Sequence, residues 1–392
     1  MDGNKNAYQT ILNGKVMQAL RASVIANPTL TWENTLTYNA GFDFTMWNGL
    51  LGMEFDAFYN YTYDILTAMG GDYPPSMGGY YYTYANYNKV DSKGVEITVS
   101  HRNKLNLAGK PFSYGASFNL TFARNRYLRY PDSPNTVEWR KRTGRSVDAS
   151  VVWVAEGLFR SEEEIDNSAW YGTRPNVGDI KYKDINGDGM VDKLDMVPLT
   201  HSTYPLLMYG LGAEIRYKNL TLGVLFKGTG KTSFFYVGQK TTVNDETRLN
   251  GMGYMPFFEG NTGNVLTLAA NPVNRWIPRD YAIAHGIDPS LAENPNARFP
   301  RLQYGNNSNN SQLSTFWQGD SRYIRLQEIT LNYHLATAFL RRIGVSSLDI
   351  QFVGNNLYVW DKVKLFDPEQ ARWNGRVYPI PSTYSLQLYV NL

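Results

Sequence analysis

Hydrophobic and polar residues alternate with a period of two through residues 34–64. In the first half, the apolar and aromatic residues share one face, at Leu36, Tyr38, Ala40, Phe42, Phe44 and Met46. After Asn48-Gly49 a second series follows, at Leu51, Met53, Phe55, Ala57, Tyr59, Tyr61 and Tyr63. This period predicts β-strands, and Asn-Gly is typical of a hairpin turn. Each run has about twelve residues, which exceeds the usual five or six and suits a tilted strand that crosses a bilayer.

The same alternation recurs along the whole chain. The segments predicted as strands are 35–46, 51–64, 95–100, 112–122, 207–217, 220–226, 329–335, 348–352 and 384–392. The connections alternate between short turns, near 47–50, 103–111, 217–219 and 336–346, and long segments, at 66–80, 127–204, 228–320 and 361–381. Outer-membrane barrels have short periplasmic turns and long extracellular loops. We therefore predict an all-β fold, an antiparallel transmembrane β-barrel segment whose first strand runs toward the periplasm and whose long loops lie outside the cell.

Composition narrows the class of protein. The mean hydropathy is −0.41 and the sequence has no apolar run of the length that a transmembrane helix needs. The net charge is only +3 and there are no cysteines, so neither a nucleic-acid-binding protein nor thiol catalysis is indicated. The sequence contains neither H-E-x-x-H nor G-x-S-x-G, and we assign no catalytic residues and expect no enzyme.

The strand count and the N-terminus suggest a part of a larger barrel. Single-chain bacterial barrels of this type have an even number of strands, and an unpaired strand edge is costly in lipid. The opening segment MDGNKNAYQT has no apolar stretch of the kind found in a signal peptide. We therefore expect residues 1–392 to be the C-terminal portion of a barrel, without a plug domain.

The sharpest local motif lies inside the long segment 127–204. Residues 184–195 match the spacing of a calcium loop, with candidate ligands at Asp184, Asn186, Asp188, Met190 (through its carbonyl), Asp192 and Asp195. Aspartate replaces the usual glutamate at the last position, and the flanking sequence does not predict two helices. The alternative is an Asx-rich turn held by bonds from side chains to the backbone. We expect structural Ca²⁺ here.

Three other groups of residues have plainer explanations. The stretch Gly228-Thr-Gly230-Lys231-Thr232 lacks the first glycine and the helix of a phosphate loop. The basic cluster Arg140, Lys141, Arg142 and Arg145 suits a solvated loop, with contact to an acidic substrate or a lipid headgroup as the alternative. The acidic run 162–164 lacks a defined partner carboxylate for glycoside cleavage. Aromatic rings in the long loops are candidates for stacking on a substrate, at Trp170, Tyr171, Trp276 and Trp317.

Several short stretches, taken in order, resemble one family. They include GDIKYKDINGDG at 178–189 and YIRLQEITLNY at 323–333, and the remaining ones are 26–33, 38–43, 90–96, 156–165, 354–360, 367–369 and 378–384. Together they resemble the C-terminal portion of a SusC/RagA-type TonB-dependent outer-membrane transporter. The chain ends at Leu392, where family barrels commonly end in phenylalanine.

The resemblance implies a function and a set of partners. Such a barrel has 22 strands, lies in the outer membrane of a Gram-negative bacterium and imports glycan or peptide fragments. A SusD-like surface lipoprotein caps it, and the TonB complex energises it through the N-terminal part of the protein. Two alternatives remain, a passive structural or adhesion barrel and a soluble glycan-binding β-module. An apolar, tyrosine-rimmed outer face would argue against the soluble module.

Overall fold

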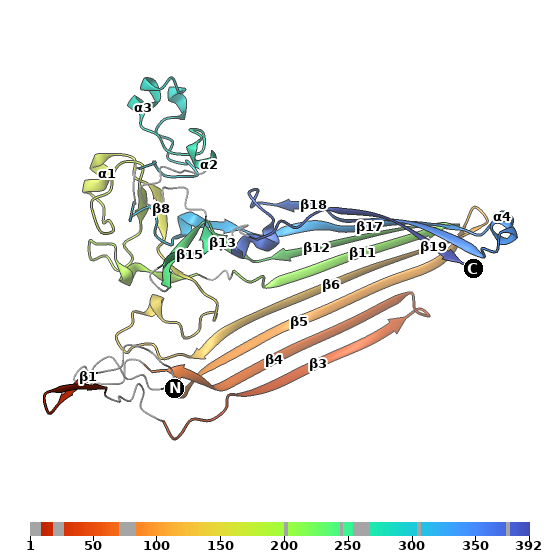
Figure 1. Cartoon of the computed structure of the whole chain (residues 1–392), viewed down its shortest axis with the longest axis horizontal. Coiled ribbons are helices and arrows are strands. Elements are labelled where there is room, and N and C mark those ends of the chain that lie inside the picture. The colour runs from red at the N-terminus through yellow and green to blue at the C-terminus, as the bar shows by residue number, and fades with distance from the viewer. Residues whose placement is uncertain are drawn as a thin grey trace.

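A single large antiparallel sheet dominates the computed structural model of this chain (Figure 1). The structure describes residues 9–18, 27–69, 84–199, 203–243, 246–253, 267–303, 307–373 and 377–392. The nine strands of the sheet are β3 (Asn34–Met46), β4 (Leu51–Ala68), β5 (Tyr84–Leu107), β6 (Lys110–Arg129), β11 (Leu207–Tyr217), β12 (Leu220–Gly230), β17 (Tyr323–Leu335), β18 (Ser347–Asp361) and β19 (Thr383–Asn391). Apart from the inserted loop elements, neighbours in sequence are neighbours in the sheet, with β3 and β19 at its edges. All nine strands predicted from the alternation are confirmed.

The strands are longer than the alternation indicated. Strand β5 extends from residue 84 to residue 107, and the predicted turn at 103–111 shrinks to Ala108-Gly109 between two paired strands. The predicted loop at 66–80 begins with the end of β4, and residues 70–83 lie outside the described part of the chain. The physical reason is that the period of two marks only the stretch with one apolar face. Backbone pairing continues where both faces are polar.

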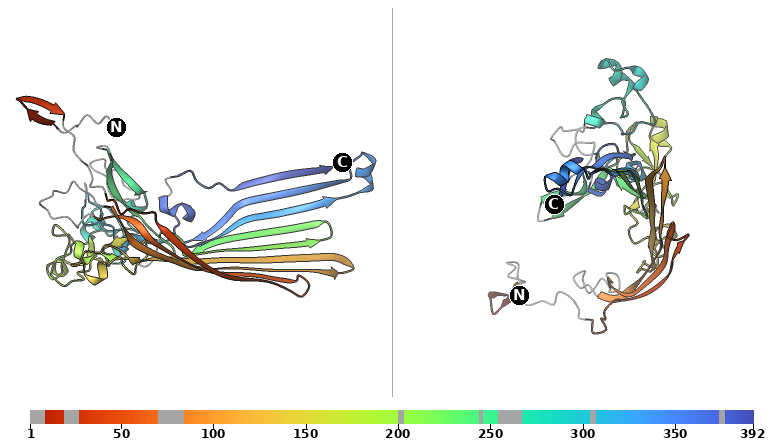
Figure 2. Two further views of the ribbon diagram at one scale, coloured as in Figure 1. Left: turned by 90° about the horizontal axis from the view of Figure 1, so that it is seen from below. Right: turned by 90° about the vertical axis from the view of Figure 1, so that its right-hand side faces the viewer.

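The sheet is bent into an open arc (Figure 2). Its register places Leu211 opposite Phe118 on one side and Phe226 on the other, so apolar side chains form continuous rows across the strands. The next row pairs Gly212 with Ser117 and belongs to the opposite face. We call the face with Leu211 the outer face and the face with Ser117 the inner face. The outer face is apolar and the inner face is polar, as a barrel wall requires when lipid lies on one side.

The two ends of the sheet differ as the loop lengths predicted. One end carries short turns, with α4 (Ala338–Arg342) in the longest of them. At the other end lie the long connections (Figure 1). The first contains η2 (Glu138–Arg140), β7 (Val151–Val152), β8 (Ala155–Leu158), α1 (Glu162–Asp166), β9 (Ile180–Tyr182), η3 (Lys193–Asp195) and β10 (Val197–Pro198). The second contains β13 (Ser233–Phe235), β14 (Val237–Val243), β15 (Glu246–Gly253), α2 (Thr267–Ala270), α3 (Arg279–Ala284), η4 (Pro289–Leu291), η5 (Thr315–Trp317) and β16 (Gln318–Asp320).

We call the described residues of 130–199 and 231–321 the loop cap. Within it β7 pairs with β10, β8 with β9, β13 with β16 and β14 with β15. A shorter connection with η6 (Pro368–Trp373) also lies at this end. Near the N-terminus, β1 (Gln9–Leu12) and β2 (Lys15–Gln18) form a hairpin that the alternation did not predict. Among the described residues, no helix is both long and apolar enough to cross a membrane.

Candidate functional site

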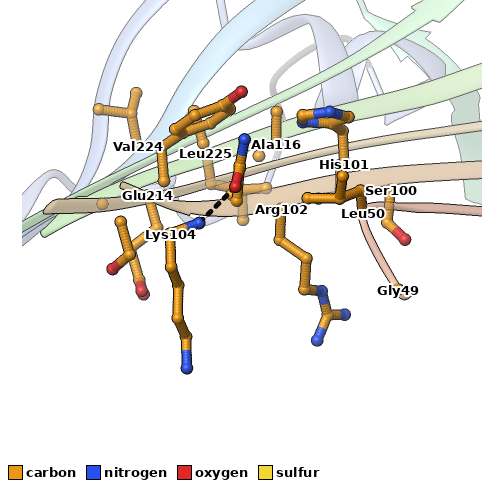
Figure 3. A pocket seen from close by; sticks show the side chains of 18 of the residues that line it. Gly49, Leu50, Ser100, His101, Arg102, Lys104, Ala116, Glu214, Val224 and Leu225 are labelled. Atoms are coloured by element: carbon orange, nitrogen blue, oxygen red, sulfur yellow. Dashed lines mark hydrogen bonds between the residues drawn. The ribbon is translucent and has the colours of Figure 1, made fainter. Parts of the chain in front are cut away.

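The inner face of the sheet borders a hollow with a volume of about 1000 Å³. Ser100, Arg102, Ser117, Glu214 and Thr330 are among its lining residues. Figure 3 shows Arg102 and Lys104 extending from one side of the sheet and His101 from the other. The hollow therefore faces polar and charged side chains, and the apolar outer face lies behind it.

Glycines leave parts of the inner face without projecting side chains. A Cβ atom on Gly212 would lie 2.9 Å from Ser117 Oγ, and one on Gly223 would collide with Thr330 Oγ1. The neighbouring strands therefore approach each other at these rows with only small side chains between them. The result is a polar surface of low relief, which suits contact with a hydrated ligand or with another polar protein surface.

The inner face carries a patch of four carboxylates. Asp43 lies opposite Glu54, and Asp56 lies opposite Glu96, so two like-charged pairs adjoin each other on β3, β4 and β5. None of the four forms an ion pair within the described part of the chain. Like charges directly opposite each other destabilise a strand pair, so this patch favours a cationic neighbour. Three basic residues of the inner face, Arg102, Lys104 and Arg216, lie nearer the short turns.

An ion-pair cluster fastens the connection 362–373 to the wall. Arg325 on β17 is 2% exposed, and its Nη2 donates to both oxygens of Asp367 at 2.6 Å. Its Nε lies 2.9 Å from a Glu369 oxygen, and Lys227 Nζ lies 2.9 Å from the same carboxylate. A buried guanidinium needs such partners because an uncompensated charge is costly. The cluster thus holds η6 and its connection against β12 and β17 at the loop end.

The loop cap has a hydrophobic core of its own, to which both long connections contribute. Trp153, Leu158, Ile180 and Tyr182 of the first connection pack with Trp276, Phe299 and Trp317 of the second. Trp317 is 1% exposed, and its Nε1 donates to the Asn310 carbonyl at 2.8 Å. Burial raises the pKa of Tyr182, whose hydroxyl donates to the Asn309 carbonyl. The two loops therefore fold as one unit.

This packing bears on the four rings predicted to contact substrate. Trp276 and Trp317 are buried in the core of the cap, where protein atoms cover them. Tyr171 is half-buried against the same core, and Trp170 is also half-buried. A role in ligand contact stays a prediction for all four. For the two buried rings it would require the cap to open.

A buried carboxylate joins the two connections through polar bonds, and sequence reasoning missed it. Asp179 is 2% exposed, and its Oδ1 accepts from Arg301 Nε at 2.8 Å, Asn310 Nδ2 at 2.7 Å and Asn307 Nδ2 at 3.1 Å. Asn310 Oδ1 in turn accepts the backbone N–H of Ile180. The asparagine-rich run at 306–310 was the signal that could have pointed to such a hub.

The calcium-like loop 184–195 is an Asx-rich turn in this structure. Both oxygens of Asp184 accept backbone N–H groups, from Gly187 and Gly189. Asp195 is fully buried and accepts from Ile185, Asn186 and Asp192. Asn186 Oδ1 accepts the Asp188 N–H, and the side chains of Asp188 and Asp192 accept the N–H groups of Met190 and Leu194. The side chain of Met190 is exposed. Within the described residues, no three acidic or histidine side chains converge as a metal site. The candidate calcium ligands are present, but their side-chain oxygens accept hydrogen bonds from the backbone. Ca²⁺ binding therefore stays a prediction.

We predict that Ca²⁺ binds this loop with a Kd of about 0.1–1 mM and that Asp188→Ala abolishes this binding. Trp139 and Trp153 donate their indole N–H groups to the carbonyls of Leu194 and Asp192, so tryptophan fluorescence reports on the loop. The measurement is a calcium titration in which tryptophan fluorescence and calorimetry detect binding. Asp166→Ala, which lies in α1 outside the motif, is the control. An identical response of the wild type and Asp188→Ala to calcium would reject the site.

Some of the other sequence candidates have structural partners. Lys141 pairs with Glu138 at 2.6 Å, and Glu162 pairs with Arg174 at 2.8 Å. The residues Gly228–Gly230 complete β12 and do not form a phosphate loop. Arg145 lines a separate cavity.

Two carboxyl groups of the loop cap are stabilised in the charged form. Burial alone would raise the pKa of Glu164, but hydrogen bonds from Lys181 Nζ and the Arg160 N–H outweigh it and lower the pKa. The pKa of Asp132 is likewise lowered, since the N–H groups of Arg142 and Thr143 and the Thr143 hydroxyl offset its burial. A lowered pKa contributes stability above the unfolded-state pKa, and this stability is lost as the pH falls through the folded-state value.

Comparison with known proteins agrees with this architecture. Residues 5–251 match the family model described as TonB dependent receptor-like, beta-barrel. The TonB-dependent receptor P26 of Formosa agariphila is 26% identical over 97% of this chain and 37% of its own length. The TonB-dependent receptor SusC of Bacteroides thetaiotaomicron is 22% identical over 92% of this chain and 32% of its own length. These relatives are named as receptors and not as enzymes.

A solved structure has a similar fold. The RagAB peptide importer in its open-open state aligns with a TM-score of 0.65 and 17% identity, over all of this chain and 38% of the matched chain. At this identity the likeness concerns the fold alone. The chain spans about a third of the length of the curated relatives it matches.

Proposed function

Because the chain belongs to the TonB-dependent receptor-like β-barrel family, we propose that it forms part of the wall and the extracellular cap of an outer-membrane importer of nutrient oligomers. The observation that carries this proposal is the two-faced sheet, with apolar rows on its outer face and polar rows on its inner face. Lipid favours the first face and a hydrated passage favours the second.

The substrate class follows from the inner wall and the relatives. Serines and glycines line the hollow together with charged residues such as Arg102, Lys104 and Glu214, and such a surface accepts chains with many hydrogen-bonding groups. Glycan and peptide fragments both fit this description. SusC and the RagAB peptide importer are among the similar proteins, which supports import of one of these two classes.

Two partners belong to the proposal. The loop cap has a packed core of its own at the end of the sheet, and such a structured cap supports docking of a SusD-like surface lipoprotein. Energy would come from the TonB complex, as the family name of the relatives suggests. In this arrangement the loop cap lies outside the cell, and the turns at Asn48-Gly49 and Lys218-Asn219 face the periplasm.

The test is growth of the native bacterium with the gene deleted. We expect deletion to abolish growth on one class of oligomer, either a glycan or a peptide digest, while growth on the free sugar or amino acids is unchanged. Restoring the gene should restore growth only in cells with an intact TonB system. Rescue that is equally good without TonB would identify a passive barrel. Unchanged growth on both classes, with altered surface attachment, would instead support the adhesion barrel.

A further inference from the structure

The outer face of the sheet changes from apolar to basic near the loop end of β5 and β6. Across these strands Val95 pairs with Phe122, and the next pair on the same face, toward the loop cap, is Lys93 with Arg124. The pair after that is Asp91 with Arg126. A charged step directly above an apolar band is where a membrane-spanning wall leaves the hydrocarbon and meets the headgroups.

Two further cations reach the same place from distant segments. Arg145 belongs to a strip of the loop cap that runs beside β6, since the Tyr127 N–H donates to its carbonyl at 2.9 Å. Lys231 follows the last residue of β12, and its Nζ lies 5.2 Å from the centre of the Phe122 ring. All these cations line one cavity of about 340 Å³, whose apolar side includes Leu199 and Leu206.

The cavity has an unbalanced positive charge. Asp91 is its one acidic lining residue among those described, and Arg126 already binds it through Nε at 3.0 Å and Nη2 at 3.0 Å. The other four cations, Lys93, Arg124, Arg145 and Lys231, form no ion pair with a carboxylate in the described part of the chain. The nearby Asp148 accepts a hydrogen bond from Asn125 instead. Four cations around one cavity repel each other unless an anion lies between them.

We propose that this cavity binds the phosphate groups of a phosphorylated lipid in the outer leaflet of the membrane. Arginine side chains bind phosphate through paired N–H groups, and lysines add point charge. The adjoining apolar surface of Phe122, Leu199 and Leu206 suits the upper part of an acyl chain. This inference rests on the outer-membrane placement in the proposed function but is independent of what is transported.

The test uses the protein purified from outer membranes in a mild detergent. The double variant Arg124→Gln, Lys231→Gln removes two cations from the cavity. The control Arg102→Gln, Lys104→Gln removes two cations from the inner face. Native mass spectrometry measures binding of diphosphorylated lipid A and of the same lipid without its phosphates. We expect the first variant to weaken binding of the phosphorylated lipid about tenfold and the control to leave it unchanged. For the dephosphorylated lipid, wild type and variant should not differ.

Three results would overturn the proposal. Equal weakening in both double variants would indicate a non-specific charge effect. Equal binding of lipid A with and without phosphates would leave only apolar contact. Complete displacement of lipid A by millimolar inorganic phosphate would identify a site for the free anion. Heat-modifiable migration checks that each variant is folded, and the single variant Lys231→Gln, which lies beyond the end of β12, replaces the double variant if that one does not fold. Loss of growth in the nutrient assay with lipid binding intact would separate the two proposals.

Discussion

Replacing Phe118 with arginine is expected to destabilise the folded barrel by about 2–4 kcal/mol, because an arginine on the lipid face near the middle of the bilayer must leave water for hydrocarbon. Phe118 lies near the centre of β6, opposite Val99 and Leu211, within the apolar rows of the outer face. The measurement is urea-dependent unfolding of the reconstituted protein, with heat-modifiable migration as an assay of the folded fraction in cells.

The neighbouring substitution Ser117→Arg is the matched control for this experiment. Ser117 lies at the same depth on the same strand, but it faces the hollow of about 1000 Å³ on the inner face. A hollow of this size accommodates the longer side chain, so we expect little loss of stability. If both arginines cost the same free energy, the assignment of the outer face to lipid is wrong.

Replacing Asp179 with alanine is expected to cost the loop cap about 3–5 kcal/mol, as removal of one partner of a buried ion pair does. The change would leave the guanidinium of Arg301 and the side-chain amides of Asn307 and Asn310 without their shared acceptor. These groups join two connections that are distant in sequence, so the connections should separate. Hydrogen exchange would then increase at Ile180 and at Trp317, and proteases would cleave within the loop cap.

The exposed ion pair of Glu162 with Arg174 provides the control for the loop cap. Its side chains are 63% and 45% exposed, and such surface pairs contribute about 0–1 kcal/mol. Glu162→Ala should therefore leave hydrogen exchange in the core of the cap unchanged. A similar increase in both variants would mean that Asp179 is not the link between the two connections.

The wall of the sheet could be predicted because its two faces have different environments. Along β11 the residues Leu211, Ala213 and Ile215 alternate with Gly212, Glu214 and Arg216, and only an extended chain separates the two sets. The limits of the strands were less accurate. On the N-terminal side of Val95, toward the loop cap, both faces of β5 become polar at residues 91–94. The alternation therefore disappears there, while the pairing with β6 continues.

The loop cap shows what sequence reasoning could not reach. Trp276 and Trp317 were predicted as candidates for stacking on a substrate, yet they pack in the core of the cap because residues from the other connection cover them. The carboxylates at 184–195 have the spacing of a calcium loop, but spacing does not tell whether their oxygens turn toward an ion or toward the backbone. In this structure the backbone N–H groups of the loop itself donate hydrogen bonds to these oxygens.

The sequence by itself determined the nine strands, their order, the short and long connections and the distinction between the two faces. These features depend on neighbouring residues and on a period of two, so they are local. Only the tertiary structure decided that Asp179 binds Arg301 and Asn310, more than 120 residues away, and that Lys231 lies beside Arg124 and Arg145. Such contacts depend on how the loops fold back over the sheet. No local sequence pattern encodes this arrangement of the loops. The free energy that stabilises it is shared among many buried contacts from both connections.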